Sequence, residues 1–205
     1  MMKSVHRVAL LAIACVAVAC GRVGFDGRAD DDDGEGGDGA DAPATGGGDG
    51  SANSGSFGST AVGGSAQMSG NNRVWVTTAT LTEPAMVDRL VVHLGVSVAA
   101  TTARGLIYTD SAGAPSTWVA STNEVALPFG TAQDWVTFAF ASPVSLAPGT
   151  YWIGTQNASA IDIQFDGQGG TTKFANDVYS DGANLSFGTG TSIVAQLSIY
   201  AAYTL

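Results

Sequence analysis

The sequence has few cysteines, histidines and basic residues, and each shortage excludes a class of function. Both cysteines lie within the first 20 of the 205 residues, so the remainder of the chain can form neither a disulfide nor a thiolate metal site. Eight Lys and Arg stand against 18 Asp and Glu, which gives a net charge of −10. Because this charge repels a phosphate backbone, we expect no nucleic acid partner.

Motifs of known catalytic sites are also absent. Beyond the first 20 residues, His93 is the only histidine. A Ser-His-Asp hydrolase would need it as the base, but the sequence has no Gly-x-Ser-x-Gly motif, and no His-Glu-x-x-His motif that would hold zinc. Nine carboxylates in residues 56–205 leave a glycosidase pair open, since chain order does not show which two converge. We therefore expect no enzyme, with a hydrolase as the last alternative.

The first residues have the pattern of a secretory signal. Lys3, His6 and Arg7 form a short positive region, and an apolar run follows from Val8 to Val18. This run is too short to span a bilayer as a stable helix. Residues 1–19 are therefore predicted to be a signal peptide.

The residues around Cys20 indicate how this signal ends. The segment Ala17-Val18-Ala19-Cys20, followed by Gly21, resembles the lipobox of bacterial lipoproteins, in which the cysteine is acylated and becomes the mature N-terminus. The resemblance implies lipidation of Cys20 and a place in the cell envelope. Gly21 stands where an Asp usually retains lipoproteins in the inner membrane, which implies the outer membrane. Cys15 is a competing site, and a plain secretory signal with buried cysteines is the other alternative.

Residues 20–55 are predicted to be a disordered tether. Two Arg stand against nine acidic residues there, including the run Asp30-Asp31-Asp32-Asp33, and most other residues are Gly, Ala or Ser. Such a stretch cannot bury enough apolar surface to offset its ordering entropy. We expect it to repel itself and to hold the following domain away from an anionic membrane.

From residue 56 onward the sequence consists of short β-rich runs separated by Gly, Pro, Asn and Asp. In one of them Leu90, Val92 and Leu94 alternate with Val91 and His93, and no stretch shows a sustained helical period with caps. This pattern predicts one all-β domain, an antiparallel β-sandwich, over residues 56–205. The predicted strands are 74–81, 89–96, 104–109, 117–120, 135–140, 150–156, 161–165 and 192–204.

Six segments of this domain follow one another in a recognisable order. They are Thr80 to Glu83, Asn123 to Val125, Trp135 to Phe138, Pro143 to Trp152, Asp177 to Gly182 and Gln196 to Ala201. Together they resemble a jelly-roll-type surface module that recurs in secreted bacterial, archaeal and phage proteins. The resemblance covers essentially all of residues 56–205, and it implies a jelly-roll-like sandwich that acts as an accessory domain. It implies no catalytic residues.

Aromatic residues in the predicted strands are candidates for ligand binding. Trp75, Trp118, Trp135 and Trp152 all fall within predicted strands, and Tyr151 and Trp152 point to opposite faces of theirs. We predict that one strand face or end loop presents an exposed ring that stacks against sugars, with Trp152, Tyr151 and Trp118 as the leading candidates and the polar loops 162–170 and 177–184 beside it. Core packing of these rings is the alternative.

Acidic residues late in the chain are candidates for binding a metal. Asp162, Asp166, Asp177 and Asp181 fall in two loop regions, and their hard oxygen ligands could hold one Ca²⁺ between adjacent loops. Turns that use Asp and Asn side chains explain the same pattern without a metal. We expect no other cofactor.

These features together predict a lipid-anchored protein of the cell envelope. It would display a non-catalytic β-sandwich for recognition or adhesion, with a membrane holding the anchor and a polysaccharide or another cell surface as the partner. A structural surface coat without a specific ligand is the alternative.

Overall fold

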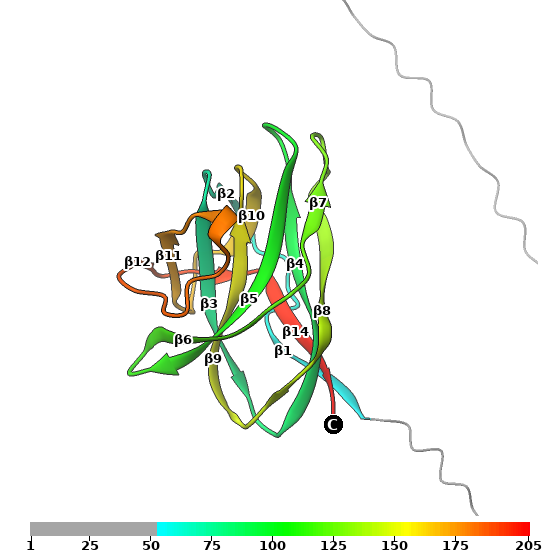
Figure 1. Ribbon diagram of the computed structural model, residues 1–205, viewed down its shortest axis with the longest axis vertical. Coiled ribbons are helices and arrows are strands. Elements are labelled where there is room, and N and C mark those ends of the chain that lie inside the picture. The colour runs from blue at the N-terminus through cyan, green and yellow to red at the C-terminus, as the bar shows by residue number, and fades with distance from the viewer. Residues whose placement is uncertain (1–52) are drawn as a thin grey trace, which may run out of the picture. The chain divides into compact units, whose positions relative to one another are not determined.

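The computed structural model describes residues 53–205, which form a sandwich of two antiparallel β-sheets (Figure 1). The one helical element in this part of the chain is a short 3-10 turn, η1 (Tyr179–Asp181). The predicted all-β sandwich is therefore confirmed. No helix among the described residues is long and apolar enough to cross a membrane. The predicted signal peptide, Cys20 and the tether up to residue 52 lie outside the described residues.

Sheet A has seven strands in the order β1-β14-β4-β10-β13, with β2 paired to β10 and β8 paired to β4. Strand β4 is central because it pairs with both β14 and β8 over most of its length. The strands are β1 (Ser54–Gly58), β2 (Ser65–Met68), β4 (Ala85–Gly95), β8 (Asp134–Leu146), β10 (Asp162–Asp166), β13 (Gln196–Leu197) and β14 (Ile199–Thr204).

Sheet B also has seven strands, in the order β12-β11-β3-β9-β5-β6, with β7 paired to β5. Strand β9 is central because it pairs with β3 on one side and with β5 on the other. The strands are β3 (Arg73–Leu81), β5 (Thr101–Ser111), β6 (Ala114–Ser121), β7 (Val125–Leu127), β9 (Gly149–Asn157), β11 (Thr172–Asn176) and β12 (Thr191–Ile193).

The main core lies between the two sheets and follows from strand alternation. On β3, Trp75, Ala79 and Leu81 belong to this core, whereas Val74 and Val76 point to the other face of sheet B. A fully buried apolar side chain of this size contributes about 1.5–3 kcal/mol to folding. The core therefore fixes which face of β3 carries Trp75.

A glycine brings β9 and β3 close together next to Trp75. A Cβ atom on Gly154 would overlap the carbonyl oxygen of Trp75, so no larger residue fits at this position of the central strand. Gly154 pairs with Val76 in the register of β3 and β9. The backbone of Trp75 on β3 therefore lies directly beside that of β9, the central strand of sheet B.

The predicted boundaries differ from the structure at both ends of the domain. Strand β1 begins at Ser54, so Ser54 and Gly55 pair with β14 although the sequence assigned them to the tether. At the other end, the predicted strand 192–204 is divided among three strands. Val194 and Ala195 lie between β12 in sheet B and β13 in sheet A, so the chain changes sheets at this point.

Candidate functional site

Trp152, the first predicted stacking residue, is fully buried. It lies on the outer face of sheet B in a second apolar cluster with Leu106, Tyr108 and Phe187. Its Nε1 donates a hydrogen bond of 2.7 Å to Oδ1 of Asp110. The prediction of an exposed stacking ring at Trp152 is therefore wrong, because a loop covers this face of the sheet.

This covering loop comprises residues 177–187, between β11 and β12. Arg104 on β5 donates a hydrogen bond of 2.8 Å to the carbonyl oxygen of Tyr179, and its guanidinium lies 4.1 Å from the centre of the Tyr179 ring. Gln156 on β9 donates to the carbonyl oxygen of Gly182 at 3.2 Å. The loop thus uses polar bonds to two strands to seal the second apolar cluster.

The other two predicted aromatic residues lie on different faces of sheet B. Trp118 is half-buried against the second apolar cluster, and its backbone N–H donates to the carbonyl oxygen of Leu185 at 3.0 Å. Tyr151 points to the main core, where its ring centre lies 6.3 Å from that of Phe57, and its hydroxyl donates to the carbonyl oxygen of Ala147 at 2.9 Å. Neither candidate is therefore a fully exposed ring, and the two lie on opposite faces of the sheet.

The four predicted calcium ligands do not converge either. Asp162 and Asp166 lie on β10 of sheet A, where Oδ1 of Asp166 accepts the N–H of Gln168 at 2.9 Å in a local turn. Asp177 and Asp181 belong to the covering loop over sheet B. Among the residues described, no group of three or more His, Cys, Asp or Glu side chains could hold a metal ion. The turn interpretation fits Asp166, and the predicted four-carboxylate site is wrong.

Asp177 is instead a buried hydrogen-bond acceptor that joins two parts of the covering loop. It is 5% exposed, and its Oδ1 accepts a hydrogen bond of 2.6 Å from the side-chain amide of Asn184. Burial raises the pKa of Asp177 above its ordinary value of 3.8, and the charge of Asp181 raises it further. The bonds from Asn184 and the charge of Arg104 oppose this shift but do not cancel it.

An aromatic group lies on the outer face of sheet A. The ring of half-buried His93 lies edge-on to Trp135 with centres 5.2 Å apart, and Trp135 lies 5.4 Å from Tyr200. His93 alternates along β4 with buried Val92 and Leu94, so its half-buried side chain lies on the outer face of the sheet. Within the described part of the chain its side chain has no hydrogen bond to a serine or carboxylate, so no triad is assembled around it.

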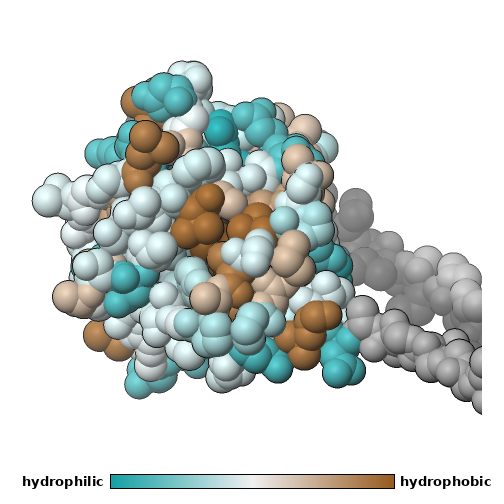
Figure 2. Space-filling model, turned by 60° about the horizontal axis from the view of Figure 1, so that its bottom comes forward, coloured by the Kyte–Doolittle hydropathy of each residue, from teal (hydrophilic) through white to brown (hydrophobic). Residues whose placement is uncertain are grey.

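The face of the domain shown in Figure 2 has few strongly apolar side chains. On the face shown in Figure 2, apolar side chains form a small central group and isolated spots among hydrophilic ones. Patches of limited extent are normal for a soluble domain and indicate no large apolar interface on this face. Hollows that combine aromatic and polar groups are therefore the more informative features.

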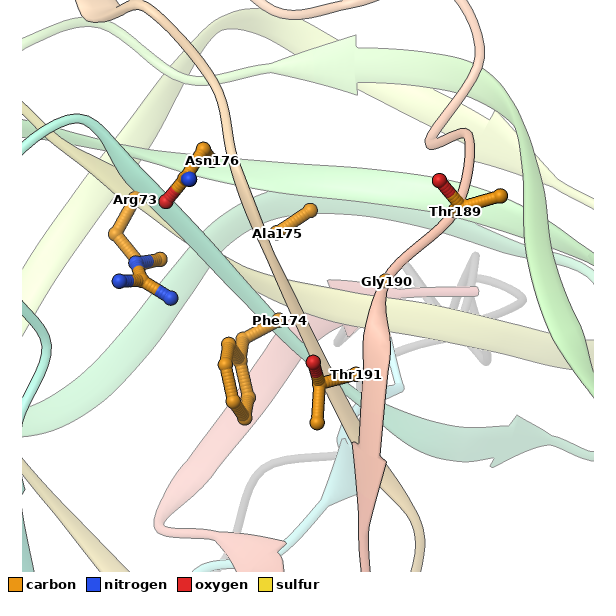
Figure 3. A pocket seen from close by; sticks show the side chains of 7 residues that line it. All are labelled: Arg73, Phe174, Ala175, Asn176, Thr189, Gly190 and Thr191. Atoms are coloured by element: carbon orange, nitrogen blue, oxygen red, sulfur yellow. The ribbon is translucent and has the colours of Figure 1, made fainter.

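Two adjoining hollows at one edge of the sandwich are both lined by Arg73 and Phe174, and we call them together the edge groove. The first, of about 370 Å³, lies at the β11–β12 hairpin, where Arg73 from β3 and Phe174 from β11 extend to the same side (Figure 3). Its other lining residues are Ala175, Asn176, Thr189, Gly190 and Thr191.

The second hollow, of about 380 Å³, lies between residues of the two sheets. Sheet A contributes exposed Met68 on β2, and sheet B contributes Trp75, Phe174 and half-buried Ile193. The rings of Trp75 and Phe174 are stacked with centres 4.4 Å apart and planes 26° apart. Its other lining residues are Gln67, Ser69 and Arg73.

Two nitrogen donors at the edge groove lack an acceptor. Nε1 of Trp75 and Nε of Arg73 are buried and have no hydrogen-bond partner within the described residues. Leaving such a donor buried without a partner costs about 1–3 kcal/mol. The guanidinium carbon of Arg73 also lies 5.3 Å from the centre of the Phe174 ring, which places a cation beside an aromatic surface. The wall of the groove therefore combines apolar rings with a cation and two buried donors that lack acceptors.

Only part of this groove could be predicted from the sequence. Trp75 falls in a predicted strand, but alternation cannot show that its indole lies at a hollow. Phe174 lies in β11, which the sequence did not predict because Thr172–Asn176 has no clear apolar alternation. The pairing of Trp75 with Phe174 depends on the register of β3 and β11, two strands distant in the chain. No family model matches this chain, and no curated protein matches it.

Proposed function

We propose that this chain is a lipid-anchored protein of the cell envelope whose β-sandwich binds a saccharide in the edge groove without catalysis. The observation that carries the proposal is the meeting of the stacked Trp75–Phe174 pair with two unpartnered donors at adjoining hollows. No other hollow described here combines an aromatic stack with a buried donor that lacks a partner.

The chemistry of a sugar ring matches this lining. A pyranose has apolar C–H faces that pack against aromatic rings, and hydroxyl and ring oxygens that accept hydrogen bonds. Asn176, Thr189 and Thr191 supply further exposed polar side chains around the first hollow. A purely apolar ligand would bring no acceptor for the guanidinium of Arg73 or for these polar side chains, whereas a saccharide brings several.

The predicted anchor complements a shallow site. Open sites of this kind bind weakly one at a time, but many lipidated copies on one surface raise the effective concentration and hence the avidity. Each buried methylene of an acyl chain contributes about 0.8 kcal/mol, so several chains on Cys20 would anchor the protein durably. Cys20→Ser should block acylation, and mass spectrometry of the mature N-terminus tests this. A lipid on Cys15, or an unmodified secreted product, would contradict the proposal.

Retention on glycans tests the binding function. The wild-type chain is passed over a panel of immobilised polysaccharides together with Phe174→Leu, which removes the ring but keeps an apolar side chain. Phe129→Leu is the matched control, because Phe129 is 66% exposed and lines none of the hollows. We expect wild type and Phe129→Leu to be retained on at least one glycan and Phe174→Leu to be retained at least about 10-fold less, a difference of about 1.4 kcal/mol.

The variants are compared only if their thermal midpoints lie within a few degrees of the wild type. Failure of the wild type to bind any glycan would contradict the proposal and leave the structural surface coat as the better account. Equal retention of Phe174→Leu and the wild type would show that saccharides bind elsewhere, with the aromatic group around Trp135 as the next surface to test.

A further inference from the structure

Arg73 and Lys173 are the two basic residues of the described part of the domain that form no ion pair. Arg89 forms an ion pair with Asp88 at 2.8 Å, and Arg104 forms one with Glu124 at 3.0 Å. Lys173 lies over the second apolar cluster, with Nζ 5.8 Å from the centre of the Trp152 ring. Arg73 has no ion pair within the described residues, although residues 56–205 contain nine acidic side chains.

The surroundings of Arg73 make this unpaired charge informative. Its Nε is buried and has no acceptor, and the same is true of Nε1 of Trp75, whose residue is only 6% exposed. Both residues line the second hollow, and Arg73 also lines the first. The guanidinium of half-buried Arg73 borders both hollows and forms no ion pair among the described residues, so an anion in the groove would gain a charge-assisted hydrogen bond there.

We infer that the edge groove binds an acidic saccharide, with the carboxylate of a uronic acid residue on Arg73. This inference rests on the proposed saccharide-binding function and names the class of sugar. The guanidinium is planar and carries its donors in a fork that matches the two oxygens of a carboxylate. The sugar ring that bears the carboxylate would then lie against the aromatic lining formed by Phe174, beside the N–H of Trp75.

The charge balance of the domain means that an acidic sugar must be attracted by the local contact with Arg73. Four basic residues stand against nine acidic ones in residues 56–205, so a ligand with dense charge is repelled by the domain as a whole. Arg73 can neutralise one carboxylate, whereas a doubly charged phosphate would remain partly uncompensated.

Methyl esterification tests the role of the carboxylate charge, because it removes the charge and leaves the sugar backbone unchanged. Short oligomers of galacturonate, glucuronate and mannuronate are compared with their methyl esters, by calorimetry on the mature full-length chain in detergent micelles. We expect at least one oligomer to bind about 10-fold or more tightly as the acid than as the ester. Rising salt should weaken the binding of the acid and leave that of the ester nearly unchanged.

Variants of Arg73 test whether its guanidinium is the group that binds the carboxylate of the sugar. Arg73→Gln should bind acid and ester equally, and Arg73→Lys should keep part of the preference because it retains a charge without the planar fork. Arg89→Gln is the control, since Arg89 is paired with Asp88 and lies on sheet A away from the edge groove. It should bind as the wild type does.

The outcomes separate this inference from the proposed function. Equal binding of acids and esters, or a preference that survives Arg73→Gln, would overturn the acidic-sugar inference while saccharide binding stands. Tighter binding of a sulfated oligosaccharide than of every uronate would overturn the assignment of a carboxylate. Absence of binding to acids, esters and the neutral glycan panel would overturn the proposed function as well.

Discussion

Trp75 on β3 and Phe174 on β11 stack across neighbouring strands, with ring centres 4.4 Å apart. The two residues are directly paired in the strand register, so the backbone itself holds the rings together. The stack has a buried edge, where Trp75 is 6% exposed, and an accessible edge, where half-buried Phe174 lines both hollows. Stability and binding therefore depend on different atoms of the same pair.

Trp75→Phe should separate these two contributions. The smaller ring loses packing contacts, which destabilises the fold. The change also removes a buried N–H that has no acceptor, and this relieves a cost of about 1–3 kcal/mol. We expect denaturant unfolding to show a loss below about 2 kcal/mol, because the two effects partly cancel, and calorimetry to show weaker glycan binding. Trp118→Phe is the control. Trp118 also has a buried Nε1 without a partner, but it packs on the outer face of sheet B and lines neither hollow of the edge groove. Unchanged affinity in Trp75→Phe would contradict a role for its N–H.

Gly154→Ala should destabilise the domain strongly. The added Cβ atom meets the backbone of Trp75, which cannot move without disturbing three paired strands. We expect a loss of about 1–3 kcal/mol or more in denaturant unfolding, as for other overpacked sites. Gly64→Ala is the matched control, because nothing lies within 4 Å of a Cβ at Gly64. Similar stabilities for the two variants would show that the β3–β9 contact is not close.

Asp177→Asn should change how stability depends on pH. Burial raises the pKa of Asp177 in the folded protein above 3.8, so the neutral carboxyl favours folding at low pH and this contribution is lost as pH rises through the raised pKa. The asparagine does not titrate. Thermal melts between about pH 4 and about pH 7 should therefore show the midpoint of Asp177→Asn rising relative to the wild type. A difference that stays constant or falls with pH would contradict the direction of the shift.

Truncations should place the start of the folded domain at β1 and not at residue 56. A chain that begins at Asn53 should unfold at the same temperature as one that begins at Gly21, because the predicted tether adds no packing. A chain that begins at Ser59 loses β1 and Phe57, which is 5% exposed, and removal of a core phenylalanine costs about 3–5 kcal/mol. A lower midpoint for the chain that begins at Asn53 would show that earlier residues pack on the domain.

The inner core could be predicted from the sequence because it imposes a period of two. Leu90, Val92 and Leu94 are all buried, as their alternation indicates, and Leu197 and Ile199 share one buried face although a strand break separates them. Strands β2 and β11 could not be predicted. Their residues are mostly polar or small, and they pair because longer strands beside them offer open edges.

The candidate site could not be predicted, because alternation assigns a residue to a face and does not show what covers that face. Tyr151 and Trp152 point to opposite sides as predicted, yet both sides are packed. The cover over Trp152 is a loop rich in Asp, Asn and Gly, whose composition indicates turns and gives no sign of docking. Contacts such as that of Arg104 with Tyr179 come from the tertiary fold alone.

The indole N–H signals of the four tryptophans provide the most direct test of the edge groove. In a nitrogen-15 spectrum of the full chain, uronate oligomers are added and each indole signal is followed. We expect the Nε1 signal of Trp75 to move, because Trp75 lines the hollow that the ligand fills, and that of Trp152 to stay in place, because it lines neither hollow and donates to Asp110. Movement of the Trp135 or Trp118 signal with an unchanged Trp75 signal would contradict the assignment of the edge groove as the binding site.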